Sequence, residues 1–292
     1  MKIGFIGLGY MGSRMAMNIL KNQYELIVYN RTKEKAGELV QNGAKLAEGP
    51  SDLAKDVDVL FSMLANPEVV EQLALGKEGF LDSLKKGSIW VDCSTVNPSF
   101  SVKMANLSKE KEINFLDAPV AGTIMPAEKG ELVFLVGGDK TILDQCKPII
   151  ECMASKILYF GANGKGTSMK MVINTMLAFG MVGFSEAMSL GKSLEIDTNK
   201  LMDVLLSSAV SPPFLSYKKE IITKGDYDKT RFPLKWMRKD LVLATKSAYE
   251  TGIAMPVTNL VKEMFALASE KGYAEKDFSA VFDLYKRSLN NF

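Results

Sequence analysis

The sequence predicts two domains: a doubly wound α/β domain with a mostly parallel sheet at residues 1–163, and an all-helical domain at residues 164–292. Short apolar runs alternate with helix-like segments through the first half, which is typical of a parallel sheet covered by helices. A glycine-rich break at 161–166 ends that alternation, and long helical periods follow it. A chain of 292 residues is also longer than one hydrophobic core usually serves.

The predicted strands of the first domain are short apolar runs, and helix-like segments separate most of them. The runs lie at residues 2–6, 25–29, 57–62, 88–92, 113–117, 132–136 and 156–160. Helices are predicted at 11–21 and 33–42, directly after the first two strands. Strands that are apolar throughout belong in a sheet that is buried on both faces.

The second domain is predicted to begin with a long central helix at 167–192. This segment is apolar on nearly every side and carries only isolated glycines as breaks, so we expect it to be buried all round. Further helical periods cover residues 198–207, 234–251, 257–271 and 278–289. We find no strand pattern in this half of the chain.

Composition excludes several classes of function. The 36 basic and 34 acidic residues nearly cancel, which gives no electrostatic reason to bind nucleic acid or an anionic membrane. The chain has no histidine, so it lacks the Ser-His-Asp triad, the Cys-His pair and nearly all histidine-ligated metal sites, and we predict no metal. Three cysteines favour a reducing compartment. With no signal peptide or membrane span expected, we predict a cytoplasmic protein.

A glycine motif follows the first strand. Residues 7–12 read Gly-Leu-Gly-Tyr-Met-Gly, matching G-x-G-x-x-G between a strand and a helix. In a Rossmann domain such glycines form a tight turn, let a pyrophosphate approach the backbone and let the helix pack on the strand. Glycines at this spacing can also simply make a turn. The context favours a dinucleotide site, and the predicted cofactor-binding residues here are Gly7, Leu8, Gly9, Tyr10, Met11 and Gly12.

The end of the second strand predicts which dinucleotide is bound. An NAD site usually places Asp or Glu there for the ribose 2′-hydroxyl, whereas this chain has Asn30, Arg31 and Thr32. The Arg31 guanidinium can hold a 2′-phosphate through two hydrogen bonds, and its neighbours can add others. The alternative is a solvated arginine in a turn. Absence of the acid together with presence of the arginine favours NADP(H).

Lysine is the obvious proton donor in a chain without histidine. Lys170 lies near the start of the central helix, four residues before Asn174, so both share one helix face. A lysine on a mostly buried helix must reach something polar. It can also extend to water near the helix end, and the residues alone leave these two interpretations equally open.

Five motifs then occur in order and resemble the β-hydroxyacid dehydrogenase family, relatives of 6-phosphogluconate dehydrogenase, over essentially the whole chain. They are Gly-Leu-Gly-Tyr-Met-Gly-Ser (7–13), Asp-Cys-Ser-Thr (92–95), Asp-Ala-Pro-Val-Ala-Gly (117–122), Gly-Lys-Gly-Thr-Ser-Met-Lys-Met-Val-Ile-Asn (164–174) and Lys-Asp-Leu (239–241). Within the family, Pro126-Ala127-Glu128 with Gly130 and the Asn-Arg-Thr turn look most like the glyoxylate and succinic semialdehyde reductases.

The resemblance implies a role for each matching residue. Lys170 is the expected catalytic lysine, with Asn174 beside it at the substrate. The other expected site residues are Met63 and Leu64 at the cofactor, Thr95 at cofactor and substrate, Gly122 and Thr123 at the substrate carboxylate, Lys239 at the cofactor, and Phe232 and Asp240 near the pocket. Ala121 departs from the family, which often has serine there.

The expected activity is therefore NADPH-dependent reduction of a small aldehyde that carries a carboxylate, such as glyoxylate or succinic semialdehyde, in a homodimer or homotetramer. We expect the active-site cleft to lie between the carboxyl edge of the sheet and the helical domain. Other β-hydroxyacid dehydrogenases, of the 3-hydroxyisobutyrate or tartronate semialdehyde type, are the main alternative. An imine reductase usually lacks the lysine, and a dinucleotide-binding module without catalysis would not need the complete set of motifs.

Overall fold

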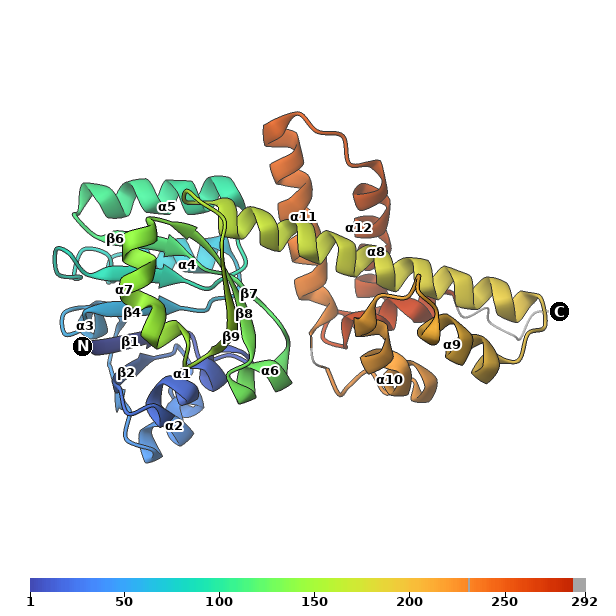
Figure 1. The fold of residues 1–292 in the computed structure, drawn as a ribbon, viewed down its shortest axis with the longest axis horizontal. Helices are drawn as coiled ribbons and strands as arrows, with labels where there is room; N and C mark the ends of the chain where they lie inside the picture. Colours follow the sequence, from blue (N-terminus) through green and yellow to red (C-terminus); the bar gives the residue numbers. More distant parts are fainter. Residues whose placement is uncertain (231, 286–292) are drawn as a thin grey trace. The chain divides into compact units, whose positions relative to one another are not determined.

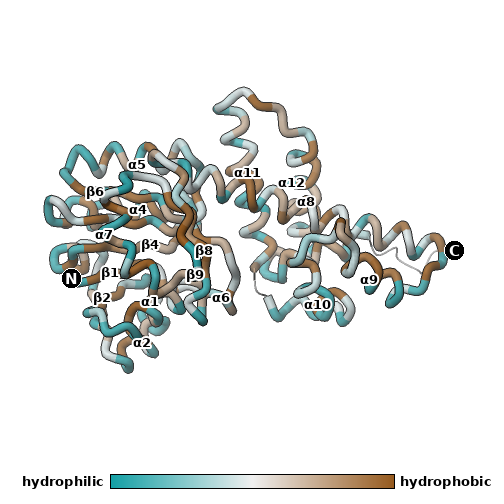
Figure 2. The backbone as a smooth tube through the Cα atoms, viewed as in Figure 1, coloured by the Kyte–Doolittle hydropathy of each residue, from teal (hydrophilic) through white to brown (hydrophobic). Residues whose placement is uncertain are grey.

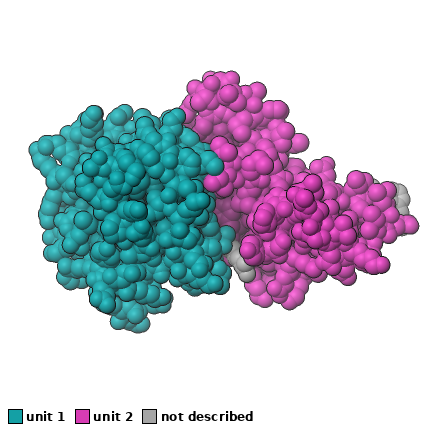
Figure 3. Space-filling model, viewed as in Figure 1, with its two compact units in different colours: residues 1–170 teal, residues 171–292 magenta. Residues whose placement is uncertain are grey.

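The computed structural model describes residues 1–230 and 232–285 (Figure 1). By its internal contacts the chain divides into two compact units, residues 1–170 and residues 171–292 (Figure 3). The first unit is built on a sheet, and the second consists of helices. The predicted combination of a doubly wound domain with a helical one is therefore confirmed.

In unit 1 the described strands form one nine-stranded sheet in the order β3-β2-β1-β4-β5-β6-β8-β7, with β9 paired to β8. Their bounds are β1 (Lys2–Ile6), β2 (Glu25–Tyr29), β3 (Lys45–Leu46), β4 (Val59–Ser62), β5 (Ile89–Asp92), β6 (Asn114–Asp117), β7 (Val120–Ala121), β8 (Leu132–Gly138) and β9 (Ala154–Tyr159). Neighbours from β3 to β6 are parallel, whereas β8 runs antiparallel to both β6 and β7. The sheet is thus mostly parallel, as predicted.

Helices cover both faces of this sheet (Figure 1). They are α1 (Gly12–Lys21), η1 (Lys33–Ala36), α2 (Gly37–Gln41), α3 (Pro50–Ala54), α4 (Pro67–Leu75), α5 (Pro98–Glu110), α6 (Ile124–Lys129) and α7 (Lys140–Ile150). Neighbouring residues of β1 point to opposite faces, so that Phe5 joins one buried cluster and Ile6 the other. In the second cluster Trp90 packs edge-on against Phe80 and Phe115. Two covered faces explain why strands such as β4 and β8 are hydrophobic along their length (Figure 2).

Unit 2 contains one hydrophobic core surrounded by helices. These are the greater part of α8 (Lys165–Ser193), then α9 (Thr198–Ser207), η2 (Pro213–Lys218), α10 (Lys219–Lys224), α11 (Leu234–Thr251), α12 (Pro256–Ala268), η3 (Ser269–Tyr273) and η4 (Phe278–Tyr285). Met181 and Met188 of α8 meet Leu234, Met237 and Phe265 in this core. Among the described residues of this unit, the only β-pairing is an isolated bridge between Pro233 and Asp277.

The structure corrects one prediction about α8. We expected a helix buried on all sides, but Val172, Met176 and Leu190 are each more than half exposed. Only one face of α8 packs into the core of unit 2, through residues such as Met181 and Met188. By length and composition alone α8 could also cross a membrane, although no membrane span was predicted from the sequence. The core helix of a soluble protein passes the same test.

Several short elements were missed or misjudged. The predicted helix at 33–42 is a 3-10 turn, η1, followed by the short α2. Strands β3 and β7 have two residues each, and α6 and α10 six each, which is too short for a periodicity to show. The predicted helix at 278–289 is the 3-10 helix η4 as far as Tyr285, and its last four residues lie outside the described part.

Candidate active site

The glycine motif forms a tight loop between β1 and α1. Gly7 has a φ of +98°, and a Cβ added there would lie 2.3 Å from the Met63 carbonyl oxygen. A Cβ on Gly12 would lie 1.9 Å from the Gly7 carbonyl oxygen. Gly9 differs, because a Cβ there would meet no described atom within 4 Å. Two of the glycines are needed for packing, and the third leaves the backbone open to a ligand.

The start of α1 has the properties of a phosphate site. Met11 precedes the helix and makes no capping hydrogen bond through its side chain, and the first turn holds no acidic residue. The main-chain N–H groups and the helix dipole at such an end favour an anion. These residues therefore fit the pyrophosphate of a dinucleotide.

Asn30 links the glycine loop to the end of β2. Its Oδ1 accepts a hydrogen bond from the Leu8 main-chain N–H at 2.9 Å, and its Nδ2 donates to the Thr32 carbonyl oxygen at 2.8 Å. Arg31 and Thr32 are exposed beside it. The structure thus brings the predicted residues of the glycine motif and of this turn together, and Asn30 has a positioning role that its sequence position alone did not show.

The loops that follow β4 and β5 are joined by buried polar contacts. The Leu64 N–H donates to Ser94 Oγ at 2.9 Å, which connects the Met63–Leu64 loop to the segment that carries Thr95. Asp92 at the end of β5 accepts from Ser62 Oγ at 2.8 Å and from the Ser94 N–H at 3.1 Å. Burial raises the pKa of Asp92 to about 6, against the effect of these hydrogen bonds.

A second buried carboxylate stands at the end of the neighbouring strand β6. Asp117 is paired in register with Asp92 and is 1% exposed. It accepts hydrogen bonds from the main-chain N–H groups of Gly164 and Thr167 and from the Thr167 hydroxyl. Burial raises the pKa of Asp117, while these hydrogen bonds act in the opposite direction. Both aspartates lie within motifs of the family resemblance, but no role was predicted for either of them.

The predicted substrate loop runs from β7 into α6. Gly122 has a φ of +127°, and a Cβ there would lie 2.8 Å from Leu132 Cδ2. Thr123 is exposed, and within the described structure its side chain makes no capping hydrogen bond to α6. The buried Asn18 of α1 donates to the Ala127 carbonyl oxygen of α6 at 2.7 Å. Helix α1, which follows the glycine loop, is therefore attached to α6, which follows the predicted substrate loop.

Three predicted site residues meet in unit 2. Asn174 Nδ2 donates to Asp240 Oδ2 at 2.6 Å, and Lys239 Nζ lies 3.0 Å from Asp240 Oδ1. Asn174 and Asp240 are each 3% exposed. Phe232 packs its ring against Phe278 in the core of the same unit, with ring centres 5.7 Å apart. The family resemblance named these residues, but their pairing could not be seen in the sequence, because the contact between Asn174 on α8 and Asp240 on α11 joins residues 66 positions apart.

Lys170 is the last residue of unit 1, and it is half-buried on α8 one helical turn before Asn174. Unit 1 thus carries Lys170 together with the glycine loop, the Arg31 turn, Thr95 and the Gly122–Thr123 loop. Unit 2 carries Asn174, Phe232, Lys239 and Asp240. These placements are consistent with the predicted roles, which remain predictions.

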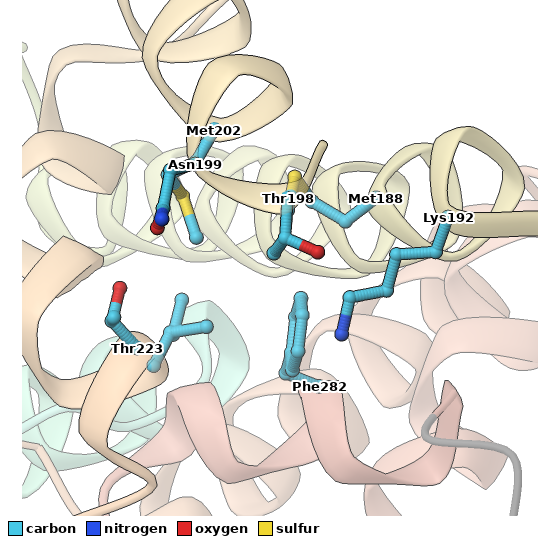
Figure 4. Close-up of a pocket in the computed structure, with 8 residues that line it drawn as sticks. Met188, Lys192, Thr198, Asn199, Met202, Thr223 and Phe282 are labelled. Atoms are coloured by element: carbon cyan, nitrogen blue, oxygen red, sulfur yellow. The ribbon is translucent and has the colours of Figure 1, made fainter. Parts of the chain in front are cut away.

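Unit 2 also contains a small cavity that none of the predicted site residues lines (Figure 4). Its volume is about 120 Å³, and helices α8, α9, α10 and η4 enclose it. The lining residues are Met188, Lys192, Thr198, Asn199, Met202, Ile222, Thr223 and Phe282. The cavity is separate from the residues gathered around Asn174, and we assign it no part in the candidate site.

Known proteins resemble this chain over nearly its whole length. The family described as the NAD binding domain of 6-phosphogluconate dehydrogenase matches residues 2–161, and that described as the NAD-binding region of NADP-dependent 3-hydroxyisobutyrate dehydrogenase matches residues 164–285. Glyoxylate/succinic semialdehyde reductase 2, chloroplastic, from Arabidopsis thaliana is 36% identical over 284 residues, which cover 97% of this chain and 79% of that protein.

Animal and bacterial relatives agree with this match. Mitochondrial 3-hydroxyisobutyrate dehydrogenase of Mus musculus is 34% identical and covers 96% of this chain and 85% of its own length. The structure of Mycobacterium tuberculosis 3-hydroxyisobutyrate dehydrogenase with L-serine superimposes with a TM-score of 0.89 at 26% identity, covering 98% of this chain and 99% of that one. The chain therefore belongs to the β-hydroxyacid dehydrogenase family and is an oxidoreductase that acts on CH–OH groups with a nicotinamide dinucleotide.

Proposed function

We propose that this enzyme uses NADPH to reduce small aldehydes that carry a carboxylate, glyoxylate and succinic semialdehyde among them, with Lys170 as the general acid. The observation that carries the proposal is that Lys170 shares unit 1 with the glycine loop, the Arg31 turn and the Gly122–Thr123 loop. One compact unit then holds groups suited to the cofactor, to a carboxylate and to a proton transfer.

The preference for NADPH rests on the turn after β2. Arg31 is exposed there, and Asn30 fixes the turn against the glycine loop through its two hydrogen bonds. A guanidinium beside the adenosine ribose would bind a 2′-phosphate through two charge-assisted hydrogen bonds. The carboxylate that would select the 2′-hydroxyl of NAD is missing from positions 30–32.

Proton transfer is assigned to Lys170. NADPH, when bound, would supply the hydride for the aldehyde carbon, and the carbonyl oxygen would take up the two π electrons of the C=O bond. Lys170 as an ammonium then donates its proton to that oxygen and becomes a neutral amine, and in the reverse direction the neutral amine accepts the hydroxyl proton. A positioned acid of this kind contributes about 10² to 10⁴ in rate. The ammonium also stabilises the negative charge that develops on the oxygen.

The substrate carboxylate is assigned to the loops of unit 1. Thr95 and Thr123 have hydroxyl groups, and the loop at Gly122 has main-chain N–H groups, all of which can donate to a carboxylate without competing for the carbonyl oxygen. The resemblance to the Arabidopsis reductase supports a short, unbranched substrate. We further propose a homo-oligomer, in line with the exposed apolar residues of α8, and a cytoplasmic location, in line with three free cysteines.

A panel of aldehydes assayed with both cofactors tests the proposal. We expect glyoxylate and succinic semialdehyde to be reduced, with kcat/KM at least about tenfold higher for NADPH than for NADH. Activity confined to methylmalonate semialdehyde and tartronate semialdehyde would assign the enzyme to another branch of its family and contradict the proposed substrates. Tight NADPH binding without turnover of any aldehyde would indicate a binding module instead.

A further inference from the structure

We infer that Asp117 is a positioning residue for Lys170: its buried carboxylate ties the first turn of α8 to the sheet and so fixes the lysine that follows on that helix. The inference rests on the catalytic role proposed for Lys170. It assigns to Asp117 a task that is separate from contact with substrate or cofactor.

The contacts are direct and join distant parts of the chain. Asp117 Oδ1 accepts from the Gly164 main-chain N–H at 2.7 Å, and Oδ2 accepts from the Thr167 N–H at 2.9 Å and from the Thr167 hydroxyl at 3.1 Å. These partners lie 47 and 50 positions away from Asp117. The first N–H groups of a helix have no partner within the helix, so a carboxylate from another element can anchor them.

The surroundings leave this first turn little freedom. A Cβ on Gly166 would lie 2.2 Å from a main-chain oxygen of β8, and one on Gly137 would lie 2.7 Å from Asp117 Oδ1. Ser101 of α5 shares a hydrogen bond of 2.9 Å with the Thr167 hydroxyl. Glycine at both positions therefore allows the helix start, the carboxylate and the strand to approach as closely as they do.

Other aspartates cap helices in a different way. Asp139 accepts from the N–H groups of Thr141 and Ile142 at the start of α7, and Asp197 accepts from the Lys200 N–H at the start of α9. Each of these belongs to the chain that leads directly into its own helix. Only Asp117, among these three, attaches a helix start to the end of a sheet strand, and only α8 carries a predicted catalytic residue.

The position of Lys170 follows from this anchor. Lys170 is three residues beyond Thr167, which places it on the same side of α8 and about 4.5 Å further along the axis. Loss of the cap would let the first turn fray and would move the lysine with it. A misplacement of about 1 Å in a catalytic group can cost about a hundredfold in rate.

A double-mutant cycle tests the inference. Asp117→Asn keeps the shape of the side chain but replaces one acceptor oxygen with an NH₂ group that faces other donors. We expect this change to lower kcat by about 10- to 100-fold and to leave the NADPH dissociation constant within about twofold. In the Lys170→Ala background the same change should cost less than about threefold, because the group that it positions is gone. Asp139→Asn is the matched control and should leave kcat within about twofold.

The outcomes separate this inference from the proposed function. If Lys170→Ala is impaired but Asp117→Asn lowers kcat by the same factor in both backgrounds, Asp117 acts independently of the lysine and the inference is wrong. Near-normal turnover of Lys170→Ala would overturn the proposed role of Lys170 and the inference together. Thr167→Val removes one donor to Asp117 and is used if Asp117→Asn does not fold. It should lower kcat several-fold only when Lys170 is present.

Discussion

The side-chain amide of Asn174 donates a hydrogen bond of 2.6 Å to the carboxylate of Asp240, and each residue is almost completely buried. A carboxylate only accepts, so the amide must present its NH₂ group to Asp240, and its orientation is thereby fixed. The other oxygen of Asp240 lies 3.0 Å from Lys239 Nζ. Burying such groups is costly unless they are paired, so we interpret the Asn174–Asp240–Lys239 cluster as a device that orients Asn174.

Asp240→Asn should therefore impair both stability and activity. Hydrogen bonds to charged groups typically contribute about 1.5–3 kcal/mol, so we expect a loss of free energy of unfolding of that order. Turnover should fall by about 10- to 100-fold because Asn174 loses its fixed orientation. Denaturant unfolding and steady-state kinetics measure the two effects.

The control for this change is Asp203→Asn in the same unit. Asp203 pairs with Lys219 at an exposed position, and a pair of that kind contributes about 0–1 kcal/mol. The control should leave turnover unchanged. If Asp240→Asn behaves like the control, the buried cluster has no part in orienting Asn174.

Lys170→Ala should lower kcat by about a hundredfold or more while the NADPH dissociation constant stays nearly the same. Proton transfer is lost in this variant, whereas the glycine loop and the Arg31 turn keep their contacts. Lys165→Ala, at the exposed first residue of the same helix, is the matched control and should be close to wild type. Turnover of Lys170→Ala near the wild-type level would remove the lysine from the reaction.

The glycine loop and its neighbouring strands could be predicted from the sequence because their signals are local. The glycines of 7–12 lie between an apolar run and a helix, and the ends of β1 and β2 were predicted to the residue. The family resemblance supplied Lys170, Asn174 and Asp240 without their contacts. The fold class and the order of most elements followed from the alternation of apolar runs with helix-like segments and from its end at residues 161–166.

The role of Asp117 and the pairing of Asn174 with Asp240 could not be predicted. Asp117 reaches Thr167 across 50 positions, and Asn174 reaches Asp240 across 66. Contacts between residues so far apart in the sequence depend on which strand ends and helix faces meet. The hydrophobic period of a single segment does not contain that information. The exposed side of α8 was missed for a related reason, since apolar composition does not show how much of a helix its neighbours cover.

Arg31→Ala should weaken NADPH binding much more than NADH binding. Only NADPH has a 2′-phosphate for the guanidinium, and loss of a charge-assisted pair is expected to cost about 2–3 kcal/mol. That range corresponds to a rise in the NADPH dissociation constant of about 30- to 150-fold. Fluorescence titration of both cofactors measures it.

Lys55→Ala provides the control for the loss of one positive charge in unit 1. Lys55 is exposed and pairs with Asp52. This variant should bind both cofactors as the wild type does. An equal loss of NADPH and NADH affinity in Arg31→Ala, or a wild-type preference for NADH, would contradict the assignment of the 2′-phosphate to Arg31.

Asp92 should make the stability of the protein depend on pH. Burial raises the pKa of Asp92 from 3.8 to about 6. Between these two values the carboxyl group is mostly protonated in the folded protein but mostly ionised in the unfolded chain. The resulting stabilisation is complete below about pH 4 and disappears as the pH rises through about 6. Two pKa units correspond to about 3 kcal/mol. Between pH 4 and pH 7 the free energy of unfolding of the wild type should therefore fall by about 3 kcal/mol more than that of Asp92→Asn.

Denaturant unfolding of both proteins across this pH range checks the sign and the size of the effect. Asp52→Asn removes an exposed carboxylate and should keep the pH dependence of the wild type. If the free energies of unfolding of the wild type and of Asp92→Asn change in parallel with pH, the pKa of Asp92 is not raised in the folded protein and the prediction is wrong.

Gly122→Ala should raise KM for the aldehyde by about tenfold or more and leave NADPH affinity unchanged. Gly122 has a φ of +127°, which an L side chain rarely adopts, and the new Cβ would lie 2.8 Å from Leu132 Cδ2, so the loop must shift. Gly43→Ala is the matched control, because Gly43 has a φ of +104° but a Cβ there meets no described atom within 4 Å. The control carries a similar backbone strain without the clash and should keep the wild-type KM. Equal KM values in Gly122→Ala and the wild type would show that this loop does not hold the substrate carboxylate.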